Sequence, residues 1–593
     1  MYPYGLIGNC QISALVSKAG SIDWLCLPRP DSDPVFGYLL DPDGGHFSIN
    51  AAGKGDASSR QYYIENTNIL TTDISTSETD SFRITDFCPR FVQHGRMFRP
   101  MMVCRIVEPL TGSPNIKVTC KPVAGWSKEP VRPVRGNSHL RFEFSNDSLS
   151  LATNMPLTYL SEETAFPLKE KLYFVLSWSA AIEEDLQQMT ERFLAQTEDY
   201  WRTWVKHCSI PSLFQKETIR SALVLKLHCY EDTGAILAAL TTSLPEEVGA
   251  QRNWDYRYCW LRDAYFVLSA FHNLGHFEEM DGYLKFLLGI AQKHKESHER
   301  LAPVYSLSQD LPVPETIRSL WRGYNGQSPV RTNNQAAEHI QNDVYGELAL
   351  TLAPIYLDDR FVHLRDKVHE DMLSNLARLC ERSISTPDAG LWEVRNGWQE
   401  HSFTNLMSWA GLERTVRIQN REYLKNLSLD TIKARDRAFA AIQKATNSGS
   451  IRNGPNDTSF DAALALASVL RLPEEKLCRE TIRDIQKNLA LSAERPNSSF
   501  FYRYVRNDDF GKPASAFVIC SFWVAQGLAR LGCREEAQRF LEDAAGAANH
   551  VGLFSEHFLP ATRTQLGNFP QAYSHVGLIN SAFAVSPPWS EVL

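Results

Sequence analysis

Two short stretches indicate how the second half of the chain folds: LGHFEE at residues 274–279 and LGCREE at residues 531–536. In each, a glycine lies where one helix would end, and acidic residues lie where the next helix would begin. Glycine caps the last carbonyls of a helix, and carboxylates favour the positive end of the following helix. A helix, turn and helix unit that recurs in this way is typical of a ring of helical hairpins.

Helical periodicity extends on both sides of these two stretches, from about residue 216 onward. The pattern predicts helices at 216–230, 260–274, 277–293, 334–356, 359–383, 403–420, 429–448, 458–470, 474–490, 514–531, 534–547 and 570–585. Twelve helices suit a closed ring of six hairpins. We therefore expect residues 216–593 to form one helical domain.

The first part of the chain has a different pattern. Short apolar and β-branched runs, separated by turn residues about every ten positions, predict a large antiparallel sandwich. These runs include Leu25–Leu27, Tyr62–Ile64, Phe82–Ile84, Met102–Ile106 and Lys171–Leu176. Residues 182–206 then become helical, with charges on one side. The sequence thus predicts a multidomain β + α protein, with a β-sandwich at 1–181, a helical linker at 182–215 and the helical domain at 216–593.

The composition excludes several classes of protein. With 43% hydrophobic and 22% charged residues among 593, the chain can bury a large core and is not a disordered protein. Charged residues of both signs are scattered along the sequence, and their net charge is −8. This argues against nucleic acid or an acidic membrane surface as a partner. No apolar run approaches the ~20 residues of a membrane span.

The amino terminus and the cysteines narrow the expectation further. The opening residues MYPYG lack a basic segment followed by an apolar stretch, so we expect a soluble cytoplasmic protein. Twelve cysteines lie far apart and lack the spacing of a zinc site. We expect most of them to be buried thiols, and we predict neither a metal ion nor a cofactor. Nothing in the sequence specifies an oligomeric state.

Three stretches concentrate tryptophan, arginine and carboxylates between predicted helices. They are RNWDYRYCWLRD at 252–263, GLWEVR at 390–395 and GLFSEH at 552–557. Loops at one end of a helical ring converge on its axis even when they are far apart in sequence, so these three could line one pocket. Sugar rings stack on indole with their apolar faces and need charged acceptors at their hydroxyl rims.

Each stretch also has a structural interpretation of its own. The first could be an ion-pair network under aromatic packing, Glu393 could start a helix, and Glu556 could be a surface acid. Together, however, they supply the two carboxylates that glycoside hydrolysis requires, one protonated to assist the leaving oxygen and one ionised to activate water.

Four segments resemble glycoside hydrolase family 15, which holds glucoamylases, bacterial-type trehalases and glucodextranases. They are TTSLPEE at 241–247, the stretches at 252–263 and 390–395, and LGNFPQAYSH at 566–575. LIGN at 6–9 and GSIDWLCLP at 20–28 resemble the amino-terminal sandwich of the same group. The resemblance spans nearly the whole chain, and it implies a β-supersandwich joined by a helical linker to an (α/α)6 barrel.

The resemblance also implies roles for individual residues. Glu393 matches the general acid, and Glu556 matches the general base that activates water. Arg262 and Asp263 match the pair that holds hydroxyls of the terminal glucose. The other residues that the resemblance places at the substrate are Trp254, Asp255, Trp260, Trp392 and Arg395.

Two departures from the family pattern bear on substrate identity. Thr404 and Asn405 precede Met407 where the family commonly has a Ser-Lys pair, and His557 follows the base where a second acid is common. Neither change removes a catalytic carboxylate. Both could alter the subsite for the leaving group.

The expected activity is that of an inverting, exo-acting α-glucoside hydrolase. It would release β-D-glucose from the non-reducing end of α-glucans or oligosaccharides, or from trehalose. An inverting glycoside phosphorylase is an alternative, although phosphorolysis needs no base and Glu556 lies in a full base motif. A non-catalytic carbohydrate-binding protein is a further alternative, which the two carboxylates disfavour. The lack of a secretion signal in this sequence favours a soluble substrate such as trehalose, maltose or short maltodextrins.

Overall fold

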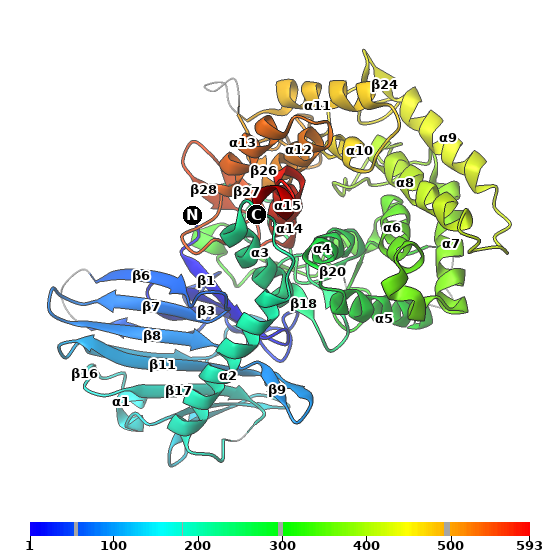
Figure 1. The fold of residues 1–593 in the computed structure, drawn as a ribbon. Coiled ribbons are helices and arrows are strands. Elements are labelled where there is room, and N and C mark those ends of the chain that lie inside the picture. Colours follow the sequence, from blue (N-terminus) through cyan, green and yellow to red (C-terminus); the bar gives the residue numbers. More distant parts are fainter. Residues whose placement is uncertain (53–56, 181, 294–299, 313, 492–497) are drawn as a thin grey trace.

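The computed structural model describes residues 1–52, 57–180, 182–293, 300–312, 314–491 and 498–593 (Figure 1). Position 181, where the sequence places the end of the first domain, lies outside the described residues. In the described chain, β-strands occupy most of the amino-terminal part, and helices dominate from residue 186 onward. This confirms the expected order of antiparallel β structure followed by helices.

Two antiparallel sheets form the amino-terminal part. Within the described residues, one sheet has the order β1-β2-β3-β5-β12-β16, with β4 paired to β3, and the other has the order β13-β14-β15-β17-β11-β8-β7-β6. The first contains β1 (Tyr4–Gly8), β2 (Ser13–Ser17), β3 (Ser21–Cys26), β4 (Pro34–Phe36), β5 (His46–Ala51), β12 (Asn115–Lys121) and β16 (Phe166–Pro167). The second contains β6 (Ser58–Tyr63), β7 (Leu70–Ser75), β8 (Ser81–Phe87), β11 (Met102–Thr111), β13 (Pro133–Arg135), β14 (His139–Glu143), β15 (Ser148–Thr153) and β17 (Leu172–Trp178).

The two sheets pack against each other. The rings of Phe47 on β5 and Phe174 on β17 lie 6.0 Å apart, centroid to centroid. Between the sheets, the fully buried guanidinium of Arg105 pairs with Asp86 at 2.7 Å and donates to the Phe47 carbonyl at 2.8 Å. Arg105 also donates to the Gly20 carbonyl at 2.8 Å, so each of its three guanidinium nitrogens has a partner and the core tolerates a buried ion pair.

The described chain contains fifteen α-helices, with short strands between some of them. The helices α1 (Leu157–Ser161) and α2 (Leu186–Lys206) precede α3 (Gln215–His228), α4 (Leu261–Leu274), α5 (Glu278–Lys293), α6 (Asp343–Leu357), α7 (Lys367–Ser383), α8 (Ser402–Gln419), α9 (Thr431–Lys444), α10 (Leu466–Val469), α11 (Glu475–Leu489), α12 (Val518–Arg530), α13 (Arg534–Ala545), α14 (Ala572–Val585) and α15 (Trp589–Val592). Short strands between them include β20 (Cys259–Trp260), β24 (Thr446–Asn447), β25 (Ser450–Ile451), β26 (Ala516–Phe517), β27 (His557–Leu559) and β28 (Thr564–Leu566).

Each predicted helix has a counterpart among α3 to α14, but several begin later than the periodicity suggests. The helix predicted at 334–356 begins only at Asp343, because Asn334 caps a short 3-10 turn at Gln335–Glu338 instead. The helix predicted at 359–383 is a 3-10 turn at Asp359–Leu364 followed by α7, whose first turn is capped by Asp366. A polar cap sets the start of α7, whereas Asn342, which precedes α6, makes no capping hydrogen bond with its side chain.

Six helices form a closed circuit of contacts. Helix α4 packs on α6, α6 on α8, α12 on α14, and α14 again on α4. Between α8 and α12, the circuit passes through the 3-10 turn Ala462–Ala465 and the short α10. In Figure 1 the helical part curves away from the two sheets, and α2 runs along the sheets before the first helix of this circuit. The residues that precede α4, α8 and α14 therefore lie at one end of the circuit.

The first strands touch the loops at that end. Tyr2 donates its hydroxyl to the Gly567 carbonyl at 3.1 Å, and Trp24 on β3 donates its indole N–H to the Leu240 carbonyl at 2.9 Å. The amino terminus accordingly lies beside β28 in Figure 1. The sheets therefore support the loops that connect the helices.

Two further findings concern residues outside these contacts. All twelve cysteines lie in the described part of the chain, are free thiols, and are mostly buried, as expected. No helix that the structure describes has the length and apolar character to cross a membrane.

Candidate active site

The three motif stretches meet in one cavity. Arg262 and Asp263 lie in the first turn of α4, Glu393 lies in the turn between α7 and α8, and Glu556 directly precedes β27. A small cavity of about 40 Å³ is lined by these four and by Trp260, Trp392, Tyr256, Arg503, Tyr573, Ala238, Leu391, Phe517 and Gln571. Six of the nine residues singled out from the sequence therefore surround a single space.

A second small cavity adjoins the first. Its lining shares Tyr256, Trp392, Glu393 and Arg503 with the first cavity. It adds Trp254, Arg395, His339, Asn334, Glu246, Arg252, Asp508, Asp509 and Phe510, among others. Glu393 thus lies between two spaces, with Glu556 in the lining of the first alone.

Asp255 is the one predicted residue that lines neither cavity. Its carboxylate receives two hydrogen bonds from Arg257, at 2.9 and 2.8 Å, and both side chains are buried. Arg257 also donates to the Ser32 carbonyl at 2.7 Å. The structure therefore places Asp255 in an ion pair that joins the site loop to the amino-terminal part.

The Glu393 carboxylate is held by two residues that the sequence also singled out. Its Oε1 accepts the Trp260 indole N–H at 2.7 Å and an Arg262 N–H at 3.2 Å. Glu393 itself has a positive φ of 61°, a backbone conformation that is rare outside glycine. Such strain is typical of functional positions, where surrounding contacts hold a side chain in place.

The guanidinium of Arg262 is held by several hydrogen bonds. It donates to the Tyr573 hydroxyl at 2.8 Å, to Gln341 Oε1 at 3.0 Å and to the Leu391 carbonyl at 3.0 Å. Its Nη2 lies 3.4 Å from Asp263 Oδ2, which has no hydrogen-bond partner among the described residues. Burial, opposed by Arg262 and aided by Glu393, raises the pKa of Asp263 to about 7. An unsatisfied buried carboxyl at the cavity edge is ready to accept a ligand hydroxyl.

Glu556 is buried, and one of its oxygens is free. Oε2 has no hydrogen-bond partner in the described part of the chain. Burial first and Glu246 second raise the pKa of Glu556 well above its usual range, while Arg503 and the Tyr256 hydroxyl oppose the rise. The close approach of the backbone requires glycine at Gly567, where φ is 72° and a Cβ would lie 2.6 Å from Oε2.

Sequence reasoning did not select four residues that shape these cavities. Tyr256, Glu246 and Tyr573 lie inside motifs that the sequence analysis quotes, so motif membership was the available signal. Arg503 lies in no quoted motif, and only its contacts with Glu246 and Asp508 reveal it. The spacing of residues within a short motif does not predict contacts between residues that are far apart in the sequence.

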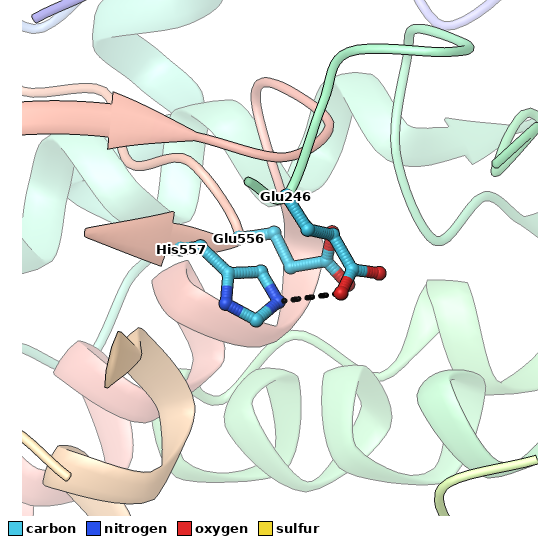
Figure 2. Close-up of side chains that lie close together, drawn as sticks. All are labelled: Glu246, Glu556 and His557. Atoms are coloured by element: carbon cyan, nitrogen blue, oxygen red, sulfur yellow. Dashed lines mark ion pairs between the residues drawn. The ribbon is translucent and has the colours of Figure 1, made fainter. Parts of the chain in front are cut away.

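The side chains of Glu246, Glu556 and His557 lie close together (Figure 2). Their nearest ligand-type atoms lie within 4.8 Å of one another, the spacing of a metal-binding group. However, an Arg503 N–H nitrogen lies 3.4 Å from Glu246 Oε2, so a guanidinium already supplies the positive charge. We therefore do not assign these residues as metal ligands.

Comparisons with known proteins agree with this geometry. The family model described as Glycosyl hydrolases family 15 matches residues 214–583, and the one described as Trehalase-like, N-terminal matches residues 3–158. The chain is a glycoside hydrolase. It belongs to glycosyl hydrolases family 15.

Relatives of known identity span nearly the whole chain. A trehalase of Thermoplasma volcanium is 30% identical over 615 residues, covering 100% of this chain and 93% of its own. A trehalase of Mycolicibacterium smegmatis is 29% identical, covering 98% of this chain and 90% of its own. A bacterial glucoamylase complexed with acarbose matches with a TM-score of 0.67 at 14% identity, over 98% of this chain and 94% of the other. The last match shows that the two chains share a fold.

Proposed function

We propose that this α-glucoside hydrolase cleaves trehalose, with inversion at the anomeric carbon that is attacked. The observation that carries the proposal is the position of Glu393 between two adjoining cavities. A general acid must reach the oxygen that joins two sugar units, with one unit on each side. Curated trehalases that match along the whole chain support trehalose as the substrate.

In this proposal the first cavity holds the glucose that is attacked. Arg262 and Asp263 bind its hydroxyls, and Trp260 and Trp392 form apolar walls. Glu556 takes a proton from water through its free Oε2, and the water oxygen bonds to the anomeric carbon. Glu393 gives its proton to the glycosidic oxygen as the old bond breaks. One water is consumed and two glucose molecules leave.

The second cavity receives the leaving glucose. Trp254 lines this cavity, and the guanidinium groups of Arg395 and Arg331 each lie 4.7 Å from the centroid of its ring. Arg395 is held by Glu315 at 3.0 Å, and its backbone N–H donates to Asp509 at 2.6 Å. These loop contacts enclose the space, which suits one sugar unit better than a long glucan.

We also propose how the chain divides. The division is a β-supersandwich at 1–181, a helical linker at 182–215 and an (α/α)6 barrel at 216–593. The closed circuit from α4 through α14 supports the barrel, and the match of the trehalase-like model to residues 3–158 supports a separate amino-terminal domain.

The test is glucose release in phosphate-free buffer from trehalose, maltose, isomaltose, maltooligosaccharides, soluble starch and dextran. We expect trehalose to be cleaved fastest, and the Glu393→Gln variant to serve as the matched blank. Release from maltooligosaccharides or starch without release from trehalose would contradict the proposed substrate. A requirement for added phosphate would contradict hydrolysis itself.

A further inference from the structure

Three acids, Glu246, Asp508 and Glu556, lie near two arginines, Arg252 and Arg503. Arg252 binds Asp508 through two N–H groups, at 2.9 and 2.6 Å. Burial acts to raise the pKa of Asp508, but hydrogen bonds, of which those from Arg252 come first, lower it below its usual value. This carboxylate is therefore ionised. Arg252 and Asp508 therefore balance each other. Among the described residues that face this cluster, Arg503 is the cation that remains for both Glu246 and Glu556.

One positive charge does not balance two buried carboxylates. Burial raises the pKa of Glu246, against the effects of Arg503 and Arg252. Burial and the Glu246 carboxylate raise the pKa of Glu556. Because two like charges this close in a buried site resist ionising together, the pair retains one proton at neutral pH. The catalytic question is which carboxyl holds it.

The hydrogen bonds of Ser515 fix the tautomer of His557. The Ser515 hydroxyl donates its single proton to the Glu246 carbonyl at 3.1 Å. Its oxygen lies 2.9 Å from His557 Nδ1, so Nδ1 must carry the hydrogen that completes this contact. Burial first, then Arg503 and Arg252, lower the pKa of His557 well below its ordinary value, so the ring is neutral. His557 Nε2 is then a hydrogen-bond acceptor.

That acceptor faces Glu246. His557 Nε2 lies 3.5 Å from Glu246 Oε2, the contact dashed in Figure 2, and makes no hydrogen bond to any described residue. Arg503 Nη2 lies 3.4 Å from the same Glu246 oxygen. The other oxygen of Glu246, Oε1, already accepts the Trp254 indole N–H at 2.8 Å. A proton on Glu246 Oε2 therefore faces the lone pair of His557 Nε2. If Glu246 were ionised, these two hydrogen-bond acceptors would face each other with no proton between them.

We propose that Glu246 and His557 are positioning residues that keep the shared proton off the general base. Glu246 is the carboxylic acid and donates to His557 Nε2, and Glu556 remains the ionised carboxylate. With Glu246 neutral, the repulsion that hinders ionisation of Glu556 is removed. This inference rests on the proposed function, because it takes Glu556 as the base.

The remaining groups that face the cluster do not compete for this proton. Burial raises the pKa of Tyr2 and of Tyr256 well above the usual range, so both phenols stay neutral. Arg252 and Asp508 form the ion pair already described, and Arg503 stays charged. Glu393, on the far side of the cavity, is paired with Arg262 at 3.2 Å.

The test is the acid limb of the pH profile of kcat/KM in the His557→Phe variant. Phenylalanine preserves the stack on Phe517, whose ring lies 4.7 Å from His557, but it offers no acceptor. Without that acceptor, the charge of Arg503 favours the ionised form of Glu246. The proton that the two carboxyl groups share then moves to Glu556. Because activity requires Glu556 ionised, the limb should move to higher pH by about one unit, the equivalent of one hydrogen bond.

A second substitution distinguishes this role from a structural one. The double variant Glu246→Gln/His557→Phe lacks the Glu246 carboxylate that repels the charge of Glu556. Glu556 should therefore ionise readily, and the limb should return toward its original pH. A packing defect would not be rescued in this way. Ser515→Ala, which frees the tautomer, should move the limb in the same upward direction as His557→Phe, and it carries the test if His557→Phe fails to fold.

An unmoved limb in folded His557→Phe or Ser515→Ala, or a double variant that is not restored, would overturn the inference. The proposed function has its own control. Glu556→Gln should lower kcat by ~10²–10⁴-fold if Glu556 is the base. Loss of turnover in Glu556→Gln together with an unmoved limb therefore rejects the proton assignment alone.

Discussion

Glu393 and Glu556 line one cavity from different surroundings. Glu393 is held by the Trp260 and Arg262 N–H groups, whereas Glu556 has an oxygen with no partner among the described residues. The free oxygen of Glu556 can accept a hydrogen bond from water, and Glu393 lies where the two cavities meet. The carboxylates were predictable from their motifs, but this difference in hydrogen bonding became visible only in the structure.

The two carboxamide variants test these assignments. Glu393→Gln and Glu556→Gln should each lower kcat by ~10²–10⁴-fold with the fold intact, because general acid or base catalysis contributes that much. Initial rates with trehalose and with an α-glucoside bearing a good leaving group should be compared. An activated aglycone needs little protonation, so it should partly rescue Glu393→Gln but not Glu556→Gln. Rescue of both, or near-normal turnover of either on trehalose, would count against the roles.

Arg262 provides a test of sugar binding. Arg262→Ala leaves Asp263 and Glu393 without their shared cation, so kcat/KM should fall roughly 10²–10³-fold, the equivalent of removing one buried charged partner. Because the contacts tighten in the transition state, kcat/KM should fall more than substrate affinity. Arg417→Ala, which removes a partly exposed partner of Glu413 on α8, is the control. Equal kinetics in the two variants would show that Arg262 is only structural.

At the scale of elements, the turn that carries Gly567 decides where Glu556 lies. Gly567→Ala should lower kcat strongly, because a Cβ would lie 2.6 Å from Glu556 Oε2. Gly449→Ala is the matched control, because Gly449 also has positive φ, 87°, but a Cβ there meets nothing within 4 Å. Both variants bear the ~1–2 kcal/mol cost of a left-handed conformation. The melting temperature should fall further in Gly567→Ala, because only there does the added Cβ meet packed neighbours. A kcat as high as that of Gly449→Ala would contradict the role of Gly567.

The sequence predicted the elements better than their ends. Apolar periodicity located counterparts of α3 to α14, but it extended α6 upstream through residues 334–342. That segment is amphipathic enough to resemble a helix, yet Asn334 and His339 belong to the second cavity and Gln341 binds Arg262. Tertiary contacts therefore override local propensity where the loop builds the site. Arg503 was missed for the same reason, since its partner Glu246 lies far away in the sequence.

At the scale of the molecule, Arg257 joins the two parts of the chain. It is buried with Asp255 and donates to the Ser32 carbonyl in the amino-terminal part. Arg257→Ala should lower the free energy of unfolding by ~3–5 kcal/mol, because it strands a buried carboxylate. Arg483→Ala, which removes an exposed partner of Glu480, should cost at most about 1 kcal/mol. Equal losses in denaturant unfolding would mean that Arg257 does not couple the two parts.

The central claim is inverting hydrolysis of trehalose by Glu393 and Glu556. Water activated by Glu556 attacks the anomeric carbon on the face opposite the bond that Glu393 protonates, so the attacked glucose leaves as the β-anomer. The other glucose keeps its own carbon–oxygen bond and leaves as the α-anomer. Proton NMR in the first minutes, before mutarotation, should therefore show α- and β-glucose in equal amounts. Initial release of α-glucose alone would contradict the account.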